Sequence, residues 1–483
     1  MSTSVIVAGA GPVGLLLAGE LRLGGAEVVV LESRAEPATE SRASTLHART
    51  MEVFDQRGLL ERLGAPPCQS MGHFGGIPLD MAALVSCYPG QWKVPQTRVE
   101  ELLAEWVGEL GADIRRGHKV TDLSVADDGV TVSVAGPAGQ PEFSAAYVVG
   151  CDGEDSTVRR LAGIPFPGRD ATREMLRADV AGLQIRERRF ERLPDGLAIA
   201  GLLPGGATRI MVGEYTPPAP RTAPATFEEL CRRWQKVTGE DISGGTPLWV
   251  NAFGNATRLA ERYRSGRVLL AGDAAHAQMP AGGQAINLGL QDAMNLGWKL
   301  AAVATGHSPD ELLDTYHQER HAVGRRVLRN IDAQSALLLG EDVEPVRTML
   351  AELIVLPEVR DVLAGTIGGL DVRYECGTHP LVGARIPHVP LDTASGQTDT
   401  TAQLRSGQGL LLDLSADSPC SARLDDLLLD CAGRVTLVRA APQQDGPIGG
   451  LDTVLVRPDG HVAWAGTRSQ DPGPALRRWF GAR

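Results

Sequence analysis

The first 32 residues alternate short apolar runs with turn and helix patterns. Val5–Ala8 predicts a buried strand, residues 13–23 predict a helix, and residues 27–31 predict a second strand, with a glycine-rich turn after the first. A strand–helix–strand unit of about 30 residues is the building block of a parallel sheet covered by helices. We therefore expect an α/β fold of the doubly wound, Rossmann type.

The rest of the chain divides into segments that differ in their pattern of apolar and polar residues. Residues 175–260 hold short β-type runs, such as 196–203 and 208–215, between Pro- and Gly-rich turns, among them residues 217–225 with four prolines. This predicts a sheet inserted into the α/β fold, placed as a lid over a substrate. Elsewhere the pattern predicts helices at residues 42–58, 98–110, 284–304 and onward to about 365, a hairpin over 120–134, and buried strands at 147–150 and 268–271.

A small unit of its own is expected at the C-terminus. The Pro- and Thr-rich residues 385–401 predict a linker to this unit. Its order of elements is thioredoxin-like, but no Cys-x-x-Cys pair is present, so we expect no redox role. The predicted strands cover residues 410–414, 434–438, 453–457 and 461–464, and the predicted helix covers 474–480.

Composition and charge exclude several classes of partner. The 483 residues carry a formal net charge of −12, which argues against nucleic acid, because phosphate binding needs a basic surface. The net charge does not exclude a local basic pocket. No apolar run reaches the roughly 18 residues that span a bilayer, and the N-terminus lacks a basic signal region, so we expect a cytoplasmic protein without a membrane partner. The seven scattered cysteines fit reduced thiols.

The motif Gly9-x-Gly11-x-x-Gly14 lies between the first strand and the first helix. In this position Gly9 permits a tight turn, Gly11 lets backbone N–H groups approach a pyrophosphate, and Gly14 lets the helix pack closely on the strand. The helix N-terminus adds a positive dipole. Glu32, 18 residues after Gly14 at the end of the second strand, can accept from a ribose hydroxyl. The motif predicts a dinucleotide but does not distinguish NAD from FAD.

A second motif follows the strand at residues 268–271. Gly272-Asp273 places a carboxylate at the carboxyl edge of the sheet, and a glycine-rich turn at 280–283 then opens a helix. A ligand that touches both Gly11 and Asp273 must be long, as FAD is, and the ribityl hydroxyls of FAD need such an acceptor. The helix N-terminus would favour negative charge on the N1–C2=O edge of reduced flavin.

These motifs, together with Asp152-Gly153-x-x-Ser156-x-x-Arg159, residues 313–321 and residues 454–460, resemble those of a known family. Over nearly its whole length the chain is similar to the class A single-component FAD-dependent aromatic hydroxylases related to p-hydroxybenzoate hydroxylase. Within them it resembles the angucycline-type hydroxylases of aromatic polyketides. We accordingly expect a Rossmann-type FAD-binding domain at 1–174, continued at 261–385. We also expect an inserted β-sheet substrate domain at 175–260, with a part near 67–100, and a thioredoxin-like domain at 390–483.

The resemblance also implies the cofactor site. Asp152 and Gly153 would serve non-covalent FAD and NADPH (or NADH), and Asp273 would hold the ribityl chain. Ala285 stands where the family usually has glycine. A Cβ there costs about 1–2 kcal/mol if a left-handed conformation is required, and nothing if residue 285 is helical. The full set of expected cofactor contacts is Gly9, Gly11, Pro12, Val13, Gly14, Glu32, Arg42, Gln96, Val120, Asp152, Gly153, Asp273, Pro280, Gly282, Gly283, Gln284, Ala285, Ile286 and Asn287.

In this family NADPH reduces the FAD, O2 adds at C4a of the flavin, and the resulting C4a-hydroperoxide transfers an oxygen atom to a phenolic ring. The resemblance therefore implies hydroxylation of a polycyclic aromatic polyketide, with no metal and no dedicated protein base, since the attacked ring is itself a phenol. A Baeyer–Villiger oxygenase, a flavin-dependent reductase or dehydrogenase, and a non-catalytic FAD- or polyketide-binding protein stay open. No zinc-site or Gly-x-Ser-x-Gly pattern supports metal or acyl-transfer chemistry.

Six further residues have both a structural and a functional interpretation. His276, after the Gly-Asp motif, is expected to serve hydrogen bonding rather than to act as a base. His47 is expected on a helix surface rather than against the substrate. The side chains that can line an aromatic pocket but more often pack in a core are Met71, Phe74, Trp92 and Trp249.

Overall fold

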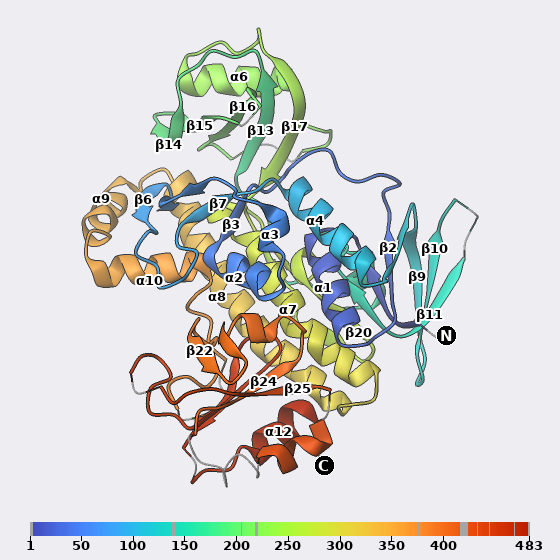
Figure 1. Ribbon diagram of the computed structural model, residues 1–483. Coiled ribbons are helices and arrows are strands. Elements are labelled where there is room, and N and C mark those ends of the chain that lie inside the picture. The colour runs from blue at the N-terminus through green and yellow to red at the C-terminus, as the bar shows by residue number, and fades with distance from the viewer. Residues whose placement is uncertain are drawn as a thin grey trace.

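The computed structural model describes residues 3–481 apart from residues 138, 140, 204, 218–220, 375, 376, 378, 416–423, 432, 444 and 468. Figure 1 shows a central α/β region, with a sheet and α6 (Phe227–Thr238) at one end and the C-terminal region with α12 (Gly473–Phe480) at the other. Cys376, Cys420 and part of the predicted loop 217–225 lie outside the described residues. The other five cysteines are free thiols. Among the described helices, none is long and apolar enough to cross a membrane.

The central sheet has eight strands. They are β1 (Thr3–Ala8), β2 (Val28–Glu32), β8 (Asp113–Arg116), β9 (Lys119–Val125), β10 (Val130–Ala135), β11 (Glu142–Gly150), β19 (Arg264–Ser265) and β20 (Val268–Leu270). Their order is β19-β20-β11-β1-β2-β8, and β10 and β9 continue from β11. The run from β20 to β8 is parallel throughout, which is the Rossmann-type arrangement predicted from the first βαβ unit. The carboxyl ends of β1, β11 and β20 therefore meet at one edge.

Helices pack on this sheet around α1 (Pro12–Leu23). Pro12 is its first residue, where the fixed φ of proline suits a helix and no N–H is needed. α1 lies against α4 (Gln96–Glu109) and α7 (Gln284–Ala304), and all three contribute to the main hydrophobic core. Further helices are α3 (Leu60–Leu63), α5 (Thr157–Leu161), α8 (Asp314–Leu339), α9 (Glu344–Leu353) and α10 (Pro357–Gly368).

The helix predicted over residues 42–58 is shorter than expected. Residues 45–47 form the strand β3 (Thr45–His47), and α2 (Ala48–Gln56) begins only after it. β3 pairs antiparallel with β7 (Gln91–Lys93), which also pairs with β4 (Cys68–Gln69). Pairing with a strand far along the chain therefore overrides the local helical pattern.

The inserted sheet is antiparallel, in the order β14-β15-β16-β13-β17. Its strands are β13 (Glu174–Ala181), β14 (Arg188–Leu193), β15 (Gly196–Leu202), β16 (Thr208–Glu214) and β17 (Thr246–Gly254). In β13, Leu176 and Ala178 pack under α6, while Met175 and Arg177 face the opposite side. The sequence pattern predicts this sheet but misses α6. The missed signal is a capping pair at its start, where the Thr226 side chain accepts from the N–H of Glu229.

Residues 385–401 are more ordered than the predicted linker. They contain a hairpin of β22 (Pro390–Thr393) and β23 (Gly396–Asp399), and Leu391 packs in the C-terminal core. The sheet that follows has the order β25-β24-β26-β27, with β24 parallel to β25 and antiparallel to β26, as in the thioredoxin-like order. Its strands are β24 (Gly409–Asp413), β25 (Val435–Arg439), β26 (Thr453–Val456) and β27 (Val462–Gly466).

The C-terminal region shares part of its hydrophobic core with α7. Trp298 of α7 packs with Trp479 and Phe480 of α12, with ring centroids 6.2 and 6.1 Å apart. This shared apolar cluster fixes the region to the helices of the central sheet.

Candidate active site

Two cavities share Arg42 in their linings. The smaller, of about 170 Å³, brings together the predicted residues Gly11, Glu32 and Gln96, and also Arg34 and Arg116, which sequence analysis did not single out. The larger, of about 680 Å³, lies between the inserted sheet and the loop that precedes α7. The predicted residues that line the larger cavity are Arg42, Pro280, Gly282, Gly283, Ala285 and Ile286.

The turn after β1 leaves open space at one of its three motif glycines. Gly9 has a φ of +107°, and a Cβ on it would lie 2.4 Å from the carbonyl oxygen of Cys151. A Cβ on Gly14 would lie 2.0 Å from the carbonyl oxygen of Gly9. A Cβ on Gly11, in contrast, would meet no atom of the described residues within 4 Å. Gly9 and Gly14 therefore close the turn, and Gly11 faces a space that a ligand can approach.

Glu32 and Val13 brace this turn. The Glu32 carboxylate accepts from the backbone N–H groups of Ala10 and Arg34, both at 2.8 Å. Val13 packs against Gly272, where a Cβ would lie 3.0 Å from its side chain. The first glycine motif and the Gly-Asp motif are therefore in direct contact.

Asp152 and Gly153 follow β11 beside the same turn. Oδ1 of Asp152 accepts from the Ser156 hydroxyl at 2.5 Å, and Oδ2 accepts from the backbone N–H of Thr157 at 2.7 Å. Asp152 therefore holds the start of α5, which is a structural role. Val120 is 7% exposed in the main core and lines neither cavity.

The Gly272-Asp273 motif begins the short helix η1 (Gly272–Ala274) and is held from α7 by Asp292. Oδ2 of this carboxylate accepts from the N–H of Gly272 at 3.2 Å and lies 2.8 Å from Nε2 of His276, and Oδ1 accepts from Arg320 at 2.7 Å. Burial opposes ionisation of Asp292, but Arg320 and His276 outweigh it and keep its pKa below the usual value. His276 thus has the hydrogen-bonding role expected of it. The Asp273 carboxylate is exposed and has no hydrogen-bond partner in the described part of the chain.

The loop between β21 (His276–Ala277) and α7 is fixed from the N-terminal half of the chain. Gly282 and Gly283 have φ angles of +64° and +68°. Nε2 of His47 lies 2.7 Å from the carbonyl oxygen of Gly282, and Nδ2 of Asn287 donates to that of Gly283 at 2.7 Å. Burial lowers the pKa of His47 to about 4, so the ring is neutral and donates its Nε2–H to the carbonyl. The expectation that His47 lies on a helix surface is wrong, and His47 does not line the larger cavity either.

Ala285 has ordinary helical angles in the first turn of α7. The positive φ angles of this loop belong to the two glycines before it, so the Cβ of Ala285 carries no conformational cost. Ala285 and Ile286 line the larger cavity. Gln284 turns away from it, and its Oε1 accepts from Gln334 at 3.0 Å.

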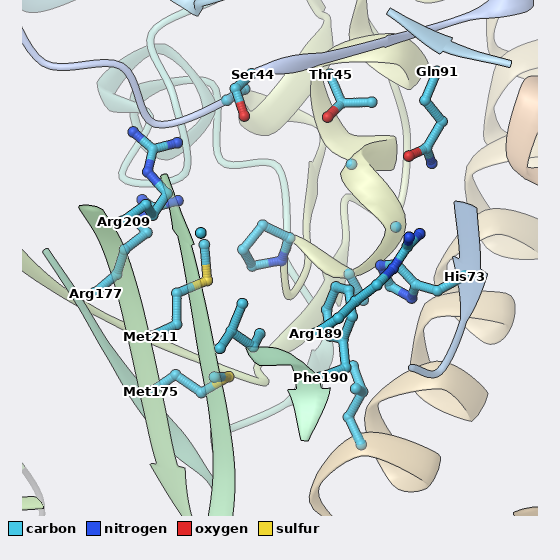
Figure 2. Close-up of a pocket in the computed structure, with 18 of the residues that line it drawn as sticks. Ser44, Thr45, His73, Gln91, Met175, Arg177, Arg189, Phe190, Arg209 and Met211 are labelled. Carbon is cyan, nitrogen blue, oxygen red and sulfur yellow. The ribbon is translucent and has the colours of Figure 1, made fainter. Parts of the chain in front are cut away.

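The larger cavity has apolar walls. Figure 2 shows Met175 and Met211 with two arginines on one side, and His73 and Phe190 on the other. Four side chains that the sequence suggested for such a pocket do not line it. For example, Phe74 packs near α10, and Trp249 donates to Asp179 at 2.9 Å. Alternation along β13 assigns residues to a face, but it does not tell which face meets a ligand. The apolar lining residues include Met175, Phe190, Leu197, Ile199, Met211, Phe253, Met279, Pro280 and Leu338.

The polar groups of this cavity carry an excess of positive charge. Arg209 is paired with Asp179 at 2.8 Å. Arg177, only 5% exposed, has no carboxylate partner among the described residues. It donates to the carbonyl oxygen of Arg42 at 2.8 Å, and its Nε has no hydrogen-bond partner in the part of the chain that the structure describes. Burial lowers the pKa of Arg177 to about 10, which still leaves a cation at neutral pH. The cavity therefore offers hydrogen-bond donors and positive charge to a ligand.

The chain is similar to known proteins over its whole length. It is 43% identical to 12-dehydrotetracycline 5-monooxygenase/anhydrotetracycline 6-monooxygenase of Streptomyces rimosus, covering 100% of this chain and 99% of that protein. It is 40% identical to dialkyldecalin synthase of Streptomyces rugosporus, with the same coverage. The crystal structure of CabE, an aromatic hydroxylase from angucycline biosynthesis, has a TM-score of 0.95 at 48% identity, and the match covers 100% of both chains.

Two family models match successive parts of the chain. The FAD binding domain model matches residues 2–331, and the aromatic-ring hydroxylase C-terminal model matches residues 379–482. Both agree with the resemblance that the motifs carry and with the Rossmann-type sheet. The chain therefore belongs to the family of FAD-dependent aromatic-ring monooxygenases.

Proposed function

We propose that this enzyme hydroxylates a polycyclic aromatic polyketide in the cytoplasm, with non-covalent FAD and with NADPH (or NADH) and O2 as co-substrates. The observation that carries the proposal is the larger cavity, of about 680 Å³, between the inserted sheet and the loop before α7. Its volume lies within the range of about 300–1,000 Å³ typical of small-molecule sites. Methionine and phenylalanine walls suit a flat, apolar ring system.

We place FAD across both cavities, with the pyrophosphate at Gly11 and the flavin ring at the loop of Gly282 and Gly283. Three observations support this placement. A Cβ at Gly11 would enter open space, Arg42 lines both cavities, and the exposed Asp273 carboxylate has no described partner. The α1 N-terminus, which begins right after Gly11, favours a phosphate there. The cofactor contacts expected from the sequence are retained, except that Val120 packs in the main core and Gln284 accepts from Gln334, and Arg34 and Arg116 are added.

FAD, when bound, supplies the redox chemistry and the activated oxygen. The protein holds the ring in place and excludes water from the reacting atoms. His47 and Asn287 fix the Gly282–Gly283 backbone, so the flavin meets a preformed surface. Arg177 faces the cavity as a cation without a carboxylate partner among the described residues, so it stabilises negative charge on a substrate oxygen as the ring is attacked. We assign no side chain as a base.

The substrate class is extended to this chain from its relatives. One relative is named for tetracycline-type substrates, and CabE belongs to angucycline biosynthesis. The donor-rich cavity fits ligands of this kind, because polyketides carry many carbonyl and phenolic oxygens. The dialkyldecalin synthase relative, together with the similar structure of the Diels-Alderase PyrE3, favours a second candidate, which is ring closure in the same cavity without net oxidation.

The test is NADPH-coupled oxygen uptake by the FAD-loaded enzyme across a panel of aromatic polyketides, with isotopically labelled O2. Hydroxylation predicts uptake of NADPH and O2 in equal amounts and a product heavier by one labelled oxygen atom. NMR of the product separates a new phenol from a Baeyer–Villiger ester. NADPH use without label in the product would indicate a reductase. A product isomeric with its substrate, formed without NADPH, would indicate ring closure.

A further inference from the structure

His73 lies on β5 (Met71–Phe74) and borders the larger cavity on the side away from Arg177 (Figure 2). Its Nδ1 accepts a hydrogen bond from the backbone N–H of Gly76 at 3.2 Å. A backbone N–H can only donate, so Nδ1 is unprotonated and the proton of the neutral ring is on Nε2. Nε2 has no hydrogen-bond partner within the described part of the chain. The ring therefore presents an N–H donor at the cavity wall.

Burial, with two neighbouring cations, keeps this ring neutral. Burial, and then Arg189 and Lys93, lower the pKa of His73 to about 3. Lys93 donates to the Thr45 hydroxyl at 3.2 Å, and Arg189 donates to the carbonyl oxygen of Met71 at 2.6 Å. Neither cation has a carboxylate partner among the described residues. The charged side chains that act on the pKa of His73 are therefore cations, and a ligand oxygen placed beside them meets their N–H donors.

Phe190 holds the imidazole in place. The two ring centroids lie 3.8 Å apart. Phe190 has a φ of +50°, the single positive φ of a non-glycine residue in the described part of the chain, at a bulge between Arg188 and Glu191. Such a conformation persists only where the surroundings impose it, and it concentrates at functional sites. The strain therefore lies at the side chain that fixes the free donor.

From this geometry we infer that His73 is a specificity-determining residue, which donates Nε2–H to a carbonyl or phenolic oxygen of the substrate and does not act as a base. Nε2 carries the proton and has no free lone pair, and Nδ1 is occupied by Gly76. The inference rests on the proposed function, since it names the group that selects an oxygen-bearing ring system. It predicts that an acceptor oxygen on the ligand, rather than ring area alone, determines affinity at this wall.

The test uses the oxidised FAD-loaded enzyme and two matched tricyclic probes, xanthone, which has a ring carbonyl, and xanthene, which lacks it. Binding is followed by the change in flavin absorbance. His73→Phe should weaken xanthone binding about 2- to 10-fold, the worth of one neutral hydrogen bond, and leave xanthene binding unchanged. His73→Gln, which keeps an N–H donor, should retain much of the preference for xanthone. Met175→Leu, a change in the apolar wall, should affect both probes alike.

A second measurement reads the tautomer without any probe. Nitrogen-15 NMR of histidine-labelled enzyme, with the His73 signal assigned by its loss in His73→Gln, should show a neutral Nε2–H ring at pH 7. An Nδ1–H ring or an imidazolium would overturn the inference, and so would an equal loss of both probes in His73→Phe. If wild-type enzyme bound neither probe, the proposed substrate class would fail and the inference with it. If it bound both and His73→Phe changed neither affinity, only the role of His73 would fail.

Discussion

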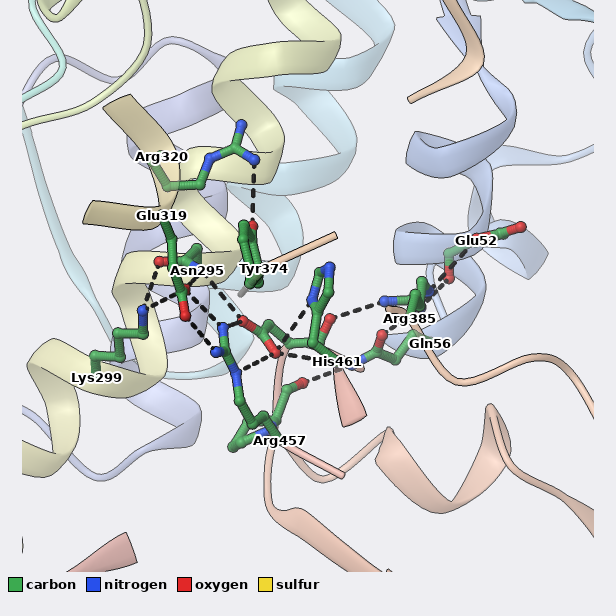
Figure 3. Close-up of polar contacts among 12 residues, drawn as sticks. Glu52, Gln56, Asn295, Lys299, Glu319, Arg320, Tyr374, Arg385, Arg457 and His461 are labelled. Carbon is green, nitrogen blue, oxygen red and sulfur yellow. Dashed lines mark hydrogen bonds and ion pairs between the residues drawn. The ribbon is translucent and has the colours of Figure 1, made fainter. Parts of the chain in front are cut away.

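A buried ion network joins the C-terminal region to α7 and α8, and Arg457 is its central cation (Figure 3). Arg457 is fully buried and donates to Oε1 of Glu319 at 2.6 Å and to Oδ1 of Asp459 at 3.1 Å. Lys299 donates to Oε2 of Glu319 at 2.7 Å. In these four groups two cations balance two carboxylates. Arg457→Met would leave Lys299 alone against both carboxylates.

Arg457→Met should lower the free energy of unfolding by about 3–5 kcal/mol, the usual cost of removing one partner of a buried ion pair. Methionine keeps apolar contact with Trp479, whose ring centroid lies 4.5 Å from the guanidinium carbon, so lost charge rather than lost volume dominates the cost. Burial opposes ionisation of Glu319, yet Arg457 and Lys299 hold its pKa at about 2.

The lowered pKa of Glu319 determines the direction in which the free energy of unfolding changes with pH. Ionised Glu319 stabilises the native protein above its ordinary pKa of 4.5, and this contribution is lost as pH falls toward 2. In Arg457→Met the native pKa of Glu319 rises, so the variant should be most destabilised near neutral pH and closer to wild type below pH 4.5.

Urea unfolding followed by tryptophan fluorescence measures the loss, with flavin absorbance as a check that the FAD site is intact at the start. The matched control is the double variant Arg457→Met with Glu319→Gln, which leaves Lys299 facing Asp459, one cation and one carboxylate. It should recover part of the stability, because the two changes act on one pair. A loss under about 1 kcal/mol, the worth of an exposed pair, would refute the reasoning, as would a double variant no more stable than the single one.

Three further outcomes are expected. Asp273→Ala should weaken FAD binding about 10- to 150-fold, since a hydrogen bond to a charged group is worth about 1.5–3 kcal/mol; an unchanged Kd in a fluorescence titration would contradict its assigned role. Ala285→Gly should leave the stopped-flow rate of flavin reduction and the peroxide yield unchanged, at a stability cost of up to about 1 kcal/mol, because residue 285 is helical; a several-fold rate change would contradict this. His73→Gln should reduce the decrease in the free energy of unfolding as the pH falls below 6.5. The reason is that the His73 ring takes up a proton near its ordinary pKa of 6.5 in the unfolded protein but only near pH 3 in the native protein. The difference amounts to about 1.4 kcal/mol per pH unit, and equal thermal-unfolding slopes between pH 6.5 and 5 would contradict it.

Sequence periodicity predicts best where packing is local along the chain. β1, α1 and β2 form one continuous unit, so the pattern of apolar residues and the final contacts coincide. The error at residues 42–47 has the opposite cause, because β3 pairs with the distant strand β7 and no local pattern carries that information. At residues 385–401 the hairpin of β22 and β23 is itself local, but the packing of Leu391 in the core of the C-terminal region depends on residues further along the chain.

The residues of the candidate site likewise fall into those that the local sequence predicts and those that only tertiary contacts reveal. The glycines at 282 and 283 indicate a loop with positive φ angles, and the Gly272-Asp273 pair predicts a carboxylate at the sheet edge. The group that fixes the loop, His47, is 235 positions from Gly282 and looks like an ordinary helix residue in its own surroundings. The free donors of the cavity are equally hidden, because whether an arginine is paired depends on tertiary contacts alone.

The net charge of the chain constrains which macromolecules can bind its surface, but it does not constrain which small ligands can bind in a cavity. The total of −12 argues against a large polyanion, whose many phosphates would face the whole surface. A small ligand in a cavity instead meets the few groups within about one Debye length, 8–10 Å, where low polarity strengthens each interaction. There the balance is reversed, because Lys93, Arg177 and Arg189 lack carboxylate partners among the described residues. Although the protein as a whole is acidic, these three cations at the cavity therefore favour an electron-rich, oxygen-bearing ligand.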